Sequence, residues 1–237
     1  MALLEGKRCL LFDAGDGLGG ALADTLRAEG AKVWRAGNGG DGKFTGAAAD
    51  VPALFAAAGA ALGGLDLVVG PAPQLAAVAP TDWRAELFEA QAARHGALTA
   101  AIGREALTRL SSPGAVCFLG SVWALATSPE AGLSGASLAA LGPLTKSLGL
   151  AGVARGVRVN AVYLGLVDTP TMRDWCAQRG KAAGVEGDVF ARAAANVPLG
   201  RAAAPAEVAR SVAFLLSAHA RFINGATVLV DGGMLYA

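Results

Sequence analysis

A glycine-rich segment near the start of the chain has the layout of a loop that could hold phosphate. The apolar run Arg8–Phe12 is followed by the letters DAGDGLGG and then by a segment of helical composition. A strand, a glycine turn and a helix N-terminus in that order present backbone N–H groups to an anion. The segment also carries two carboxylates, Asp13 and Asp16, where a diphosphate would lie. Two interpretations follow: a working nucleotide loop, or a turn that only connects strand to helix.

Hydroxyl and imidazole side chains offer a second possible chemistry. Ser121 follows an apolar run, Ser134 lies thirteen residues later, and His95 lies within a long helical segment. Together with Asp13 they could form a site for proton transfer without redox chemistry, such as dehydration or isomerisation. No spacing requires them to converge. Ser121 is equally a hydroxyl at a strand end, and His95 is equally a structural or interface residue.

Composition argues against several other classes of function. The three cysteines are isolated and the chain has only two histidines, so no metal site is expected. The net charge is +1 without long runs of Lys or Arg, so we expect no nucleic-acid partner. We expect no signal peptide, because the first residues include an acid and no long apolar run, and the chain has no uninterrupted apolar stretch of about 18 residues. We therefore expect a cytoplasmic protein with no membrane partner.

An alternation of strands and helices must position these groups. Strands are predicted at 8–12, 31–36, 44–51, 65–70, 115–120, 156–165 and 226–230. Helices are predicted at 20–30, 53–62, 81–110, 134–154, 169–195 and 205–217, with Thr81 as the N-cap of the longest. Buried β-branched runs separated by helices imply parallel strands joined by right-handed crossovers. The prediction is an α/β fold in a single domain, residues 1–237: a Rossmann-like doubly wound parallel sheet with helices on both faces.

Several segments together resemble the short-chain dehydrogenase/reductase (SDR) superfamily. The stretch PLGRAAAPAEVARSVAFLLSAHARFINGATVLVDGGML, residues 198–235, is similar to the C-terminal third of that family. GVRVNAVYLGLVDTPTM is similar to the segment before it, except that Leu164 stands where the family usually has proline. The segments AAADV and GGLDLVV match in place. The resemblance extends over the whole chain in outline and implies the classical SDR fold.

The residues that carry the family's reaction are mostly replaced. The family uses Ser, Tyr and Lys, assisted by Asn; Ser121 matches the serine, but Ser134 occupies the tyrosine position and Leu138 the lysine position. The asparagine position falls near Ala90 or Gln91. A phenol with a pKa near 10 needs a nearby ammonium before it can pass a proton, and neither replacement restores that pair. The resemblance thus implies a degenerate member without the Tyr-x-x-x-Lys motif, in which Ser121 is a remnant.

The phosphate-binding part of the family's cofactor site is retained only in part. Gly17 and Gly19 match the last two glycines of the T-G-x-x-x-G-x-G loop, whereas Phe12 and Asp13 stand at its Thr-Gly start. Two like charges about 4 Å apart repel by roughly 1 kcal/mol in water and roughly 4 kcal/mol at an effective dielectric of 20. Asp13 therefore opposes a diphosphate. The family's N-N-A-G loop is replaced by Gly70–Pro73, where two prolines remove N–H donors.

The contacts to the rest of the cofactor are similarly incomplete. The second strand should end in an acid or arginine at the ribose, and this position falls at Gly37 or Asn38. Asp50 and Val51 match the family's adenine-side pair, although Asp50 is equally suited to capping a turn. Thr169 matches the residue that contacts the nicotinamide amide, and equally suits a turn into a helix. We expect the phosphate-binding role of the glycine loop to be lost.

Three hypotheses follow. In the first, the chain is a non-catalytic subunit (a pseudoenzyme) that binds no cofactor and assembles with an active SDR homologue, most simply as a heterotetramer. This pattern resembles the inactive subunit of heteromeric SDR complexes such as the NAD-dependent hydroxyacyl-CoA dehydrogenase of the benzylsuccinate pathway. Apolar segments that the family uses for subunit contacts are well kept, and self-association is the alternative to a mixed complex. The second hypothesis is a non-redox enzyme in a remodelled cleft, and the third is a nucleotide- or ligand-binding regulatory module.

Overall fold

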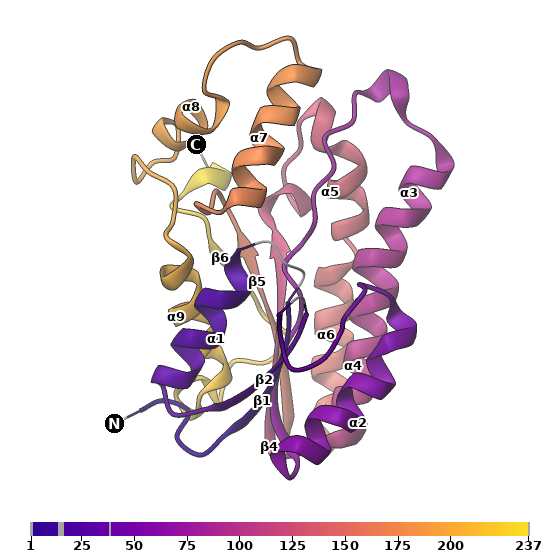
Figure 1. Cartoon of the computed structure of the whole chain (residues 1–237), viewed down its shortest axis with the longest axis vertical. Helices are drawn as coiled ribbons and strands as arrows, with labels where there is room; N and C mark the ends of the chain where they lie inside the picture. The colour runs from indigo at the N-terminus through magenta and orange to yellow at the C-terminus, as the bar shows by residue number, and fades with distance from the viewer. Residues whose placement is uncertain (1, 14–16, 38, 237) are drawn as a thin grey trace.

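Six strands pair into one parallel sheet in the computed structural model, which describes residues 2–13, 17–37 and 39–236 (Figure 1). They are β1 (Arg8–Phe12), β2 (Lys32–Ala36), β3 (Leu65–Val69), β4 (Leu110–Ser121), β5 (Val157–Leu164) and β6 (Thr227–Val230). Their order across the sheet is β2-β1-β3-β4-β5-β6. In the register of β1, Leu10 lies opposite Trp34 of β2 and Val68 of β3. The predicted Rossmann-like doubly wound fold is confirmed.

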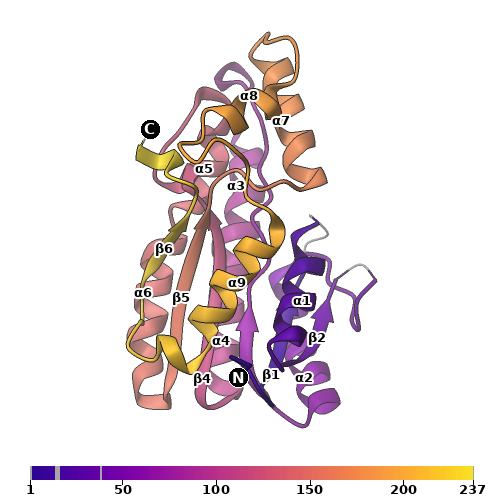
Figure 2. The ribbon, with the colours of Figure 1, turned by 90° about the vertical axis from the view of Figure 1, so that its left-hand side faces the viewer.

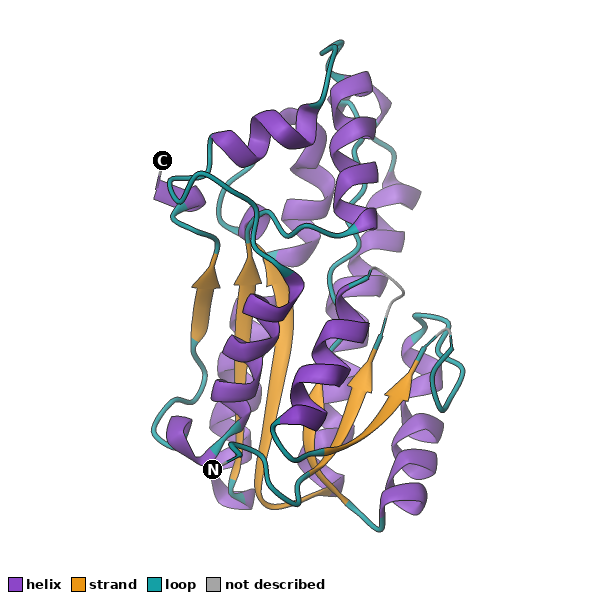
Figure 3. Ribbon diagram, turned by 60° about the vertical axis from the view of Figure 1, so that its left-hand side comes forward, coloured by secondary structure: helices purple, strands orange, loops and turns teal. Residues whose placement is uncertain are grey.

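Helices cover both faces of this sheet. On one face lie α1 (Leu18–Ala28) and α9 (Pro205–Leu216), side by side (Figure 2). The other face is covered by α2 (Val51–Leu62), α4 (Leu98–Arg109) and α6 (Leu141–Gly152). Toward and beyond the carboxyl ends of the strands lie α3 (Ala85–Ala92), α5 (Gly132–Leu138), α7 (Pro170–Ala182) and α8 (Val189–Ala195) (Figure 3). Within the described ranges, no helix combines the length and the apolar character needed to cross a membrane.

Alternating strand residues enter two hydrophobic cores. In β1, Cys9 and Leu11 face the core under α1 and α9, whereas Leu10 and Phe12 face the core under α2 and α4. All four side chains are buried. Period-two alternation between two apolar layers is what a sheet covered on both faces requires. Because burying one large apolar side chain contributes about 1.5–3 kcal/mol, the strand ends form a rigid platform for the loops that follow them.

The strand expected at 44–51 is wrong. Residues Ala48–Asp50 form a 3-10 turn, and Val51 begins α2. Before it, the chain pairs with β2 at an isolated bridge between Ala36 and Gly42, and Phe44 packs on Phe12 of β1. The segment is rich in glycine and alanine, which supply little side-chain area for strand packing. As a result β2 is the edge of the sheet.

The three longest predicted helical segments are interrupted, and the one expected at 169–195 is divided into α7 and α8. The segment expected to be helical from Thr81 begins instead with a 3-10 turn, and α3 starts at Ala85 with Arg84 as its N-cap. A π-helical turn over Ala93–Ala97 then joins α3 to α4. The helix expected at 134–154 is divided into α5 and α6. Helical periodicity predicts such segments correctly but does not register a single wide turn within them.

The path of the chain changes direction at β1. The connection after β1 leads to β2 on one side, and the chain then returns to β3 on the other side. In open parallel sheets, ligands bind outside the carboxyl ends of the strands at such a reversal. The segments that follow β1, β3, β4 and β5 meet there, and they contain most of the residues that the sequence singles out.

Candidate functional site

A cavity of about 210 Å³, here called the cleft, lies at the carboxyl ends of the strands. It is lined by segments that follow four different strands, including Leu18 after β1, Pro73 after β3, Ser121 at the end of β4 and Val167 after β5. Residues of α7 close its remaining side. Its walls are largely apolar, with a few polar groups, which is the usual composition of a small-molecule site.

Two of the predicted site residues, Ser121 and Thr169, meet in the cleft. Both are buried. The Ser121 hydroxyl oxygen accepts the backbone N–H of Trp123 at 3.3 Å, and that of Thr169 accepts the N–H of Met172 at 3.2 Å. The second contact caps α7. Because each oxygen is used as an acceptor by the backbone, each hydroxyl proton remains able to donate.

Trp175 of α7 is a wall of the cleft that no sequence motif indicated. Its indole Nε1 is buried, and nothing in the part of the chain that the structure describes accepts its proton. The guanidinium of Arg179 lies 5.8 Å from the Trp175 ring and 5.4 Å from the Trp123 ring, and 3.4 Å from the Glu130 carboxylate. These cation–π and ionic contacts fasten α7 over the cleft.

Ser134, to which the resemblance assigns the family's tyrosine position, is fully buried and holds two segments together. Its hydroxyl oxygen accepts the N–H of Ala76 at 2.9 Å, in the loop after β3. Its proton has two acceptors at 3.3 Å, the Ala76 carbonyl and the side-chain oxygen of Gln91 in α3. Gln91, which the resemblance places near the family's asparagine position, therefore contacts Ser134. Leu138, to which the resemblance assigns the lysine position, is buried in α5.

His95 lines a second, smaller cavity of about 40 Å³, here called the histidine cavity. Burial, and next the positive charge of Arg94, lowers the pKa of His95 to about 4, against a smaller opposing effect of the Gln74 backbone. The two cavities share Ala72 and Pro73, but Ser121 lines only the cleft. As far as the described residues go, Ser121, Ser134, His95 and Asp13 do not converge on one cavity.

In the glycine loop, the carboxylate of Asp13 lies against the start of α1. Gly17 adopts a positive φ of 89°, and a Cβ there would lie 2.9 Å from the Pro170 ring at the start of α7. A Cβ at Gly19, in the first turn of α1, would overlap with the Asp13 carboxyl group. Asp13 is buried, 3.4 Å from the Arg35 guanidinium. A diphosphate at this turn would face that carboxylate, and Asp16 lies outside the described residues.

The remaining cofactor-related positions have local structural roles. The Asp50 carboxylate accepts the hydroxyl of Thr45 at 2.6 Å and its N–H at 3.0 Å, contacts that lower the pKa of Asp50. Val51 is buried in the core. Gly37 packs closely on Asp13, and Asn38 lies outside the described residues. Asp50 therefore closes the turn before α2.

Among the described residues, no three His, Cys, Asp or Glu side chains are arranged to hold a metal ion.

The loop at Gly70–Pro73 leaves β3 in a fixed direction, because the Gly70 N–H donates to the Cys117 carbonyl at 2.9 Å. Pro71 and Pro73 then line the histidine cavity. The rigid turn, rather than backbone N–H donors, defines this side of the site.

Similarity to known proteins, in sequence and in structure, identifies the family of this chain. The family model described as enoyl-(acyl carrier protein) reductase matches residues 46–235. The 3beta-hydroxysteroid dehydrogenase 1 of Eggerthella lenta is 33% identical, with 98% of this chain and 94% of the relative covered. The 2-(S)-hydroxypropyl-CoM dehydrogenase 3 of Xanthobacter autotrophicus is 32% identical, with coverage of 98% and 89%. The crystal structure of a dehydrogenase/reductase from Sinorhizobium meliloti 1021 has a TM-score of 0.84 at 26% identity, covering 99% of this chain and 96% of that one. The chain therefore belongs to the short-chain dehydrogenase/reductase superfamily of oxidoreductases.

Proposed function

We propose that this chain is a non-catalytic SDR subunit that assembles with an active SDR homologue, and that the homologue alone binds NAD and oxidises the substrate alcohol or hydroxyacyl-CoA. The observation that carries the proposal is the state of the two reaction positions. The Ser134 hydroxyl is fully buried and bonded to the backbone of Ala76, and Leu138 is packed in α5. Neither can protonate a carbonyl, because one is a structural anchor and the other has no ionisable group.

The cofactor side of the site supports the same proposal. Asp13 places a carboxylate beside the first turn of α1, where the helix dipole would otherwise attract a phosphate. Pro170 approaches Gly17 closely, so α7 lies directly on the glycine turn. Leu138 offers no ammonium to the ribose. These residues do not fit a dinucleotide in the family's arrangement, and we propose that this chain binds none.

Exposed apolar side chains support assembly with a second subunit. Every residue from Thr81 to Ala90 is exposed, including the large side chains of Leu87 and Phe88 in α3. On α6, Leu150 is 77% exposed, and Phe222, in the turn after α9, is fully exposed. Helices with uncovered apolar faces are typical of subunit contacts. The resemblance assigns these helices to such contacts.

Co-expression with an intact Tyr-x-x-x-Lys homologue encoded beside this chain tests the proposal. We expect the two chains to co-purify, and NAD-dependent oxidation to require the homologue. We expect this chain alone to show no turnover and no NAD binding at millimolar concentration in calorimetry. A control replaces the homologue's motif tyrosine by phenylalanine, which should abolish turnover without dissociating the complex. A chain that oxidises alcohols by itself, or a stable homo-oligomer that no such homologue joins, would refute the proposal.

A further inference from the structure

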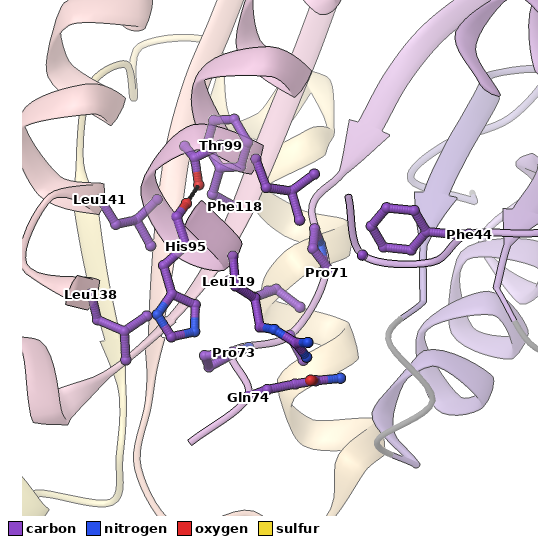
Figure 4. A pocket seen from close by; sticks show the side chains of 14 residues that line it. Phe44, Pro71, Pro73, Gln74, His95, Thr99, Phe118, Leu119, Leu138 and Leu141 are labelled. Atoms are coloured by element: carbon purple, nitrogen blue, oxygen red, sulfur yellow. Dashed lines mark hydrogen bonds between the residues drawn. The ribbon is translucent and has the colours of Figure 1, made fainter. Parts of the chain in front are cut away.

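A cavity of about 690 Å³, here called the basal groove, lies at the amino ends of the strands, at the end of the sheet opposite the cleft. It is larger than the cleft and than the histidine cavity (Figure 4). It is lined by Lys7 before β1, by the first residues of β5, by residues 113–115 of β4 and by the turn after α9, at the lower end of the sheet in Figure 2. Small-molecule pockets have volumes of about 300–1,000 Å³, so the basal groove has room for a ligand.

The charged side chains of the basal groove all have the same sign. Among the described residues that line it, Lys7, Arg158 and Arg221 are cationic and none is acidic. None of these three forms an ion pair within the part of the chain that the structure describes. The Asp66 carboxylate, close enough to Lys7 to feel its charge, does not line the groove and is paired with Arg8 at 2.8 Å. The whole chain has a net charge of only +1, so this concentration of positive charge is local.

Arg158 is the cation that the fold holds in place. Its side chain is half-buried, and its guanidinium donates to the carbonyls of Leu216, Ser217 and Ile223 at 3.3, 3.0 and 3.1 Å. A guanidinium has five N–H groups, so two remain to donate. Burial lowers the pKa of Arg158, and only the Cys117 thiol opposes that effect. A partly buried cation without a counter-ion favours an anionic ligand.

The rest of the basal groove is mainly apolar. Its lining includes the buried side chains of Leu67, Val157 and Leu216 and the exposed side chain of Val153. An inorganic anion would leave this surface in water, whereas a hydrocarbon chain gains free energy with each CH₂ group that it buries there. The strands β3, β4 and β5 are each paired on both sides, so the groove offers no sheet edge to an extended peptide. The lining therefore suits a small ligand with an anionic head and an apolar chain.

We propose that the basal groove binds the anion of a medium-chain fatty acid, with its carboxylate on the guanidinium of Arg158 and its chain along the apolar lining. Lys7 and Arg221 add to the positive potential around the carboxylate. The turn that Arg158 holds is also tied to β5 and α6 by the side chain of Asn224, through two hydrogen bonds of 2.9 Å. The site is therefore largely formed before the ligand arrives, which favours binding. It lies beyond the proposed function, because it needs neither a partner subunit nor a dinucleotide.

Calorimetry on the full chain with three probes tests the proposal. Octanoate has both the carboxylate and the chain, 1-octanol lacks the charge, and acetate lacks the chain. We expect 1-octanol to bind at least tenfold more weakly than octanoate, because the hydrogen bonds to a charged group are lost. We expect acetate to bind at least a hundredfold more weakly, because no chain is buried. Equal affinity for octanoate and 1-octanol, or no binding of octanoate at millimolar concentration, would overturn the proposal.

Variants locate the site. Ala218 is exposed and lines the groove. Ala218→Glu should weaken octanoate about tenfold relative to Ala218→Gln, which has the same size without the charge, while 1-octanol should bind these two variants equally. Arg221→Gln should weaken octanoate about threefold, and the matched control Arg210→Gln, exposed on α9 outside the groove, should not.

Equal affinity of octanoate for the Glu and Gln variants of Ala218 would show that it binds elsewhere on the chain, and would overturn the proposed site. If a variant at Ala218 fails to fold, the comparison of Arg221→Gln with Arg210→Gln decides in its place, and equal affinities there would have the same meaning. Neither comparison depends on whether a partner subunit exists.

Discussion

At the scale of single residues, the Asp13 carboxylate is the sharpest departure from a nucleotide-binding loop. It occupies the space beside Gly19 and lies 3.4 Å from Arg35. Removing it would leave the Arg35 guanidinium facing the turn, and would replace repulsion of a diphosphate by attraction.

We predict that Asp13→Gly raises the affinity of the isolated chain for NAD by about tenfold, or about 1.4 kcal/mol. Hydride transfer should remain absent, because Ser134 and Leu138 are unchanged. Calorimetry with NAD measures the affinity, and the exposed Asp24→Asn is the matched control. If Asp13→Gly binds NAD no better than the unaltered chain, charge at the turn is not what excludes the dinucleotide.

The buried His95 should make stability depend on pH. Burial lowers its pKa from 6.5 to about 4 in the folded state, so the unfolded chain takes up the proton first as the pH falls. The contribution of His95 to stability is therefore fully present above pH 6.5, and is lost progressively toward pH 4. The resulting change in the free energy of unfolding between these pH values is at most about 3 kcal/mol.

Urea unfolding between pH 4 and 7 measures this dependence. We expect the slope of the free energy of unfolding against pH to be smaller in His95→Asn than in the unaltered chain, because the titrating group is gone. The exposed His219→Asn variant is the matched control for replacing a histidine. Equal slopes in all three proteins would show that His95 is protonated as easily when folded as when unfolded.

Residue spacing predicted part of the site. It placed Ser121 and Thr169 at strand and turn ends, and the parallel sheet brings those ends to one edge. It could not show that Ser134 holds Ala76, because that contact joins segments 58 residues apart. Trp175 and the pairing of His95 with Ser137 carry no local signal either, since both depend on how helices pack.

At the scale of elements, six of the seven strands predicted from apolar runs are present in the sheet, as β1 to β6. The expected strand at 44–51 was wrong because the letters AAAD suit the start of a helix as well as a strand. The hydrogen bond between Asp50 and Thr45 stabilises a turn there instead.

The π-helical turn at Ala93–Ala97 matters more for function. It lies where His95 enters the histidine cavity, and wide turns of this kind are frequent at functional sites.

The helix α3 is the element that most clearly lacks a covering neighbour. Leu87 and Phe88 are each about 40% exposed, and burying such side chains contributes about 1.5–3 kcal/mol apiece. We predict that Leu87→Glu or Phe88→Glu weakens subunit association at least tenfold. Analytical ultracentrifugation measures the dissociation constant. The matched control is Val185→Glu in the loop after α7, which is similarly exposed and should not alter association.

At the scale of the whole molecule, Ser134 and Leu138 lie inside the fold, whereas large apolar side chains lie on the outer surface of α3 and α6. Ser134 and Leu138 stabilise the interior, while α3 and α6 keep apolar side chains at the surface. A subunit of this design would act by holding a partner in its active arrangement, without touching the reacting atoms. In such a subunit, substitutions at the contact surface would change assembly of the complex. Substitutions in the cleft would leave the rate of the reaction unchanged.

The separation can be measured in the reconstituted complex. Ser121→Ala in this chain should leave the turnover number of the complex within about twofold, because Ser121 would have no substrate to polarise. Leu87→Glu should lower turnover in proportion to the complex that is lost, and excess partner should restore it by mass action. If Ser121→Ala instead lowers turnover tenfold or more while the complex stays intact, then this chain's own cleft takes part in the chemistry. In that case Ser121 and the buried indole N–H of Trp175, for which the described residues offer no acceptor, would be the groups in contact with substrate.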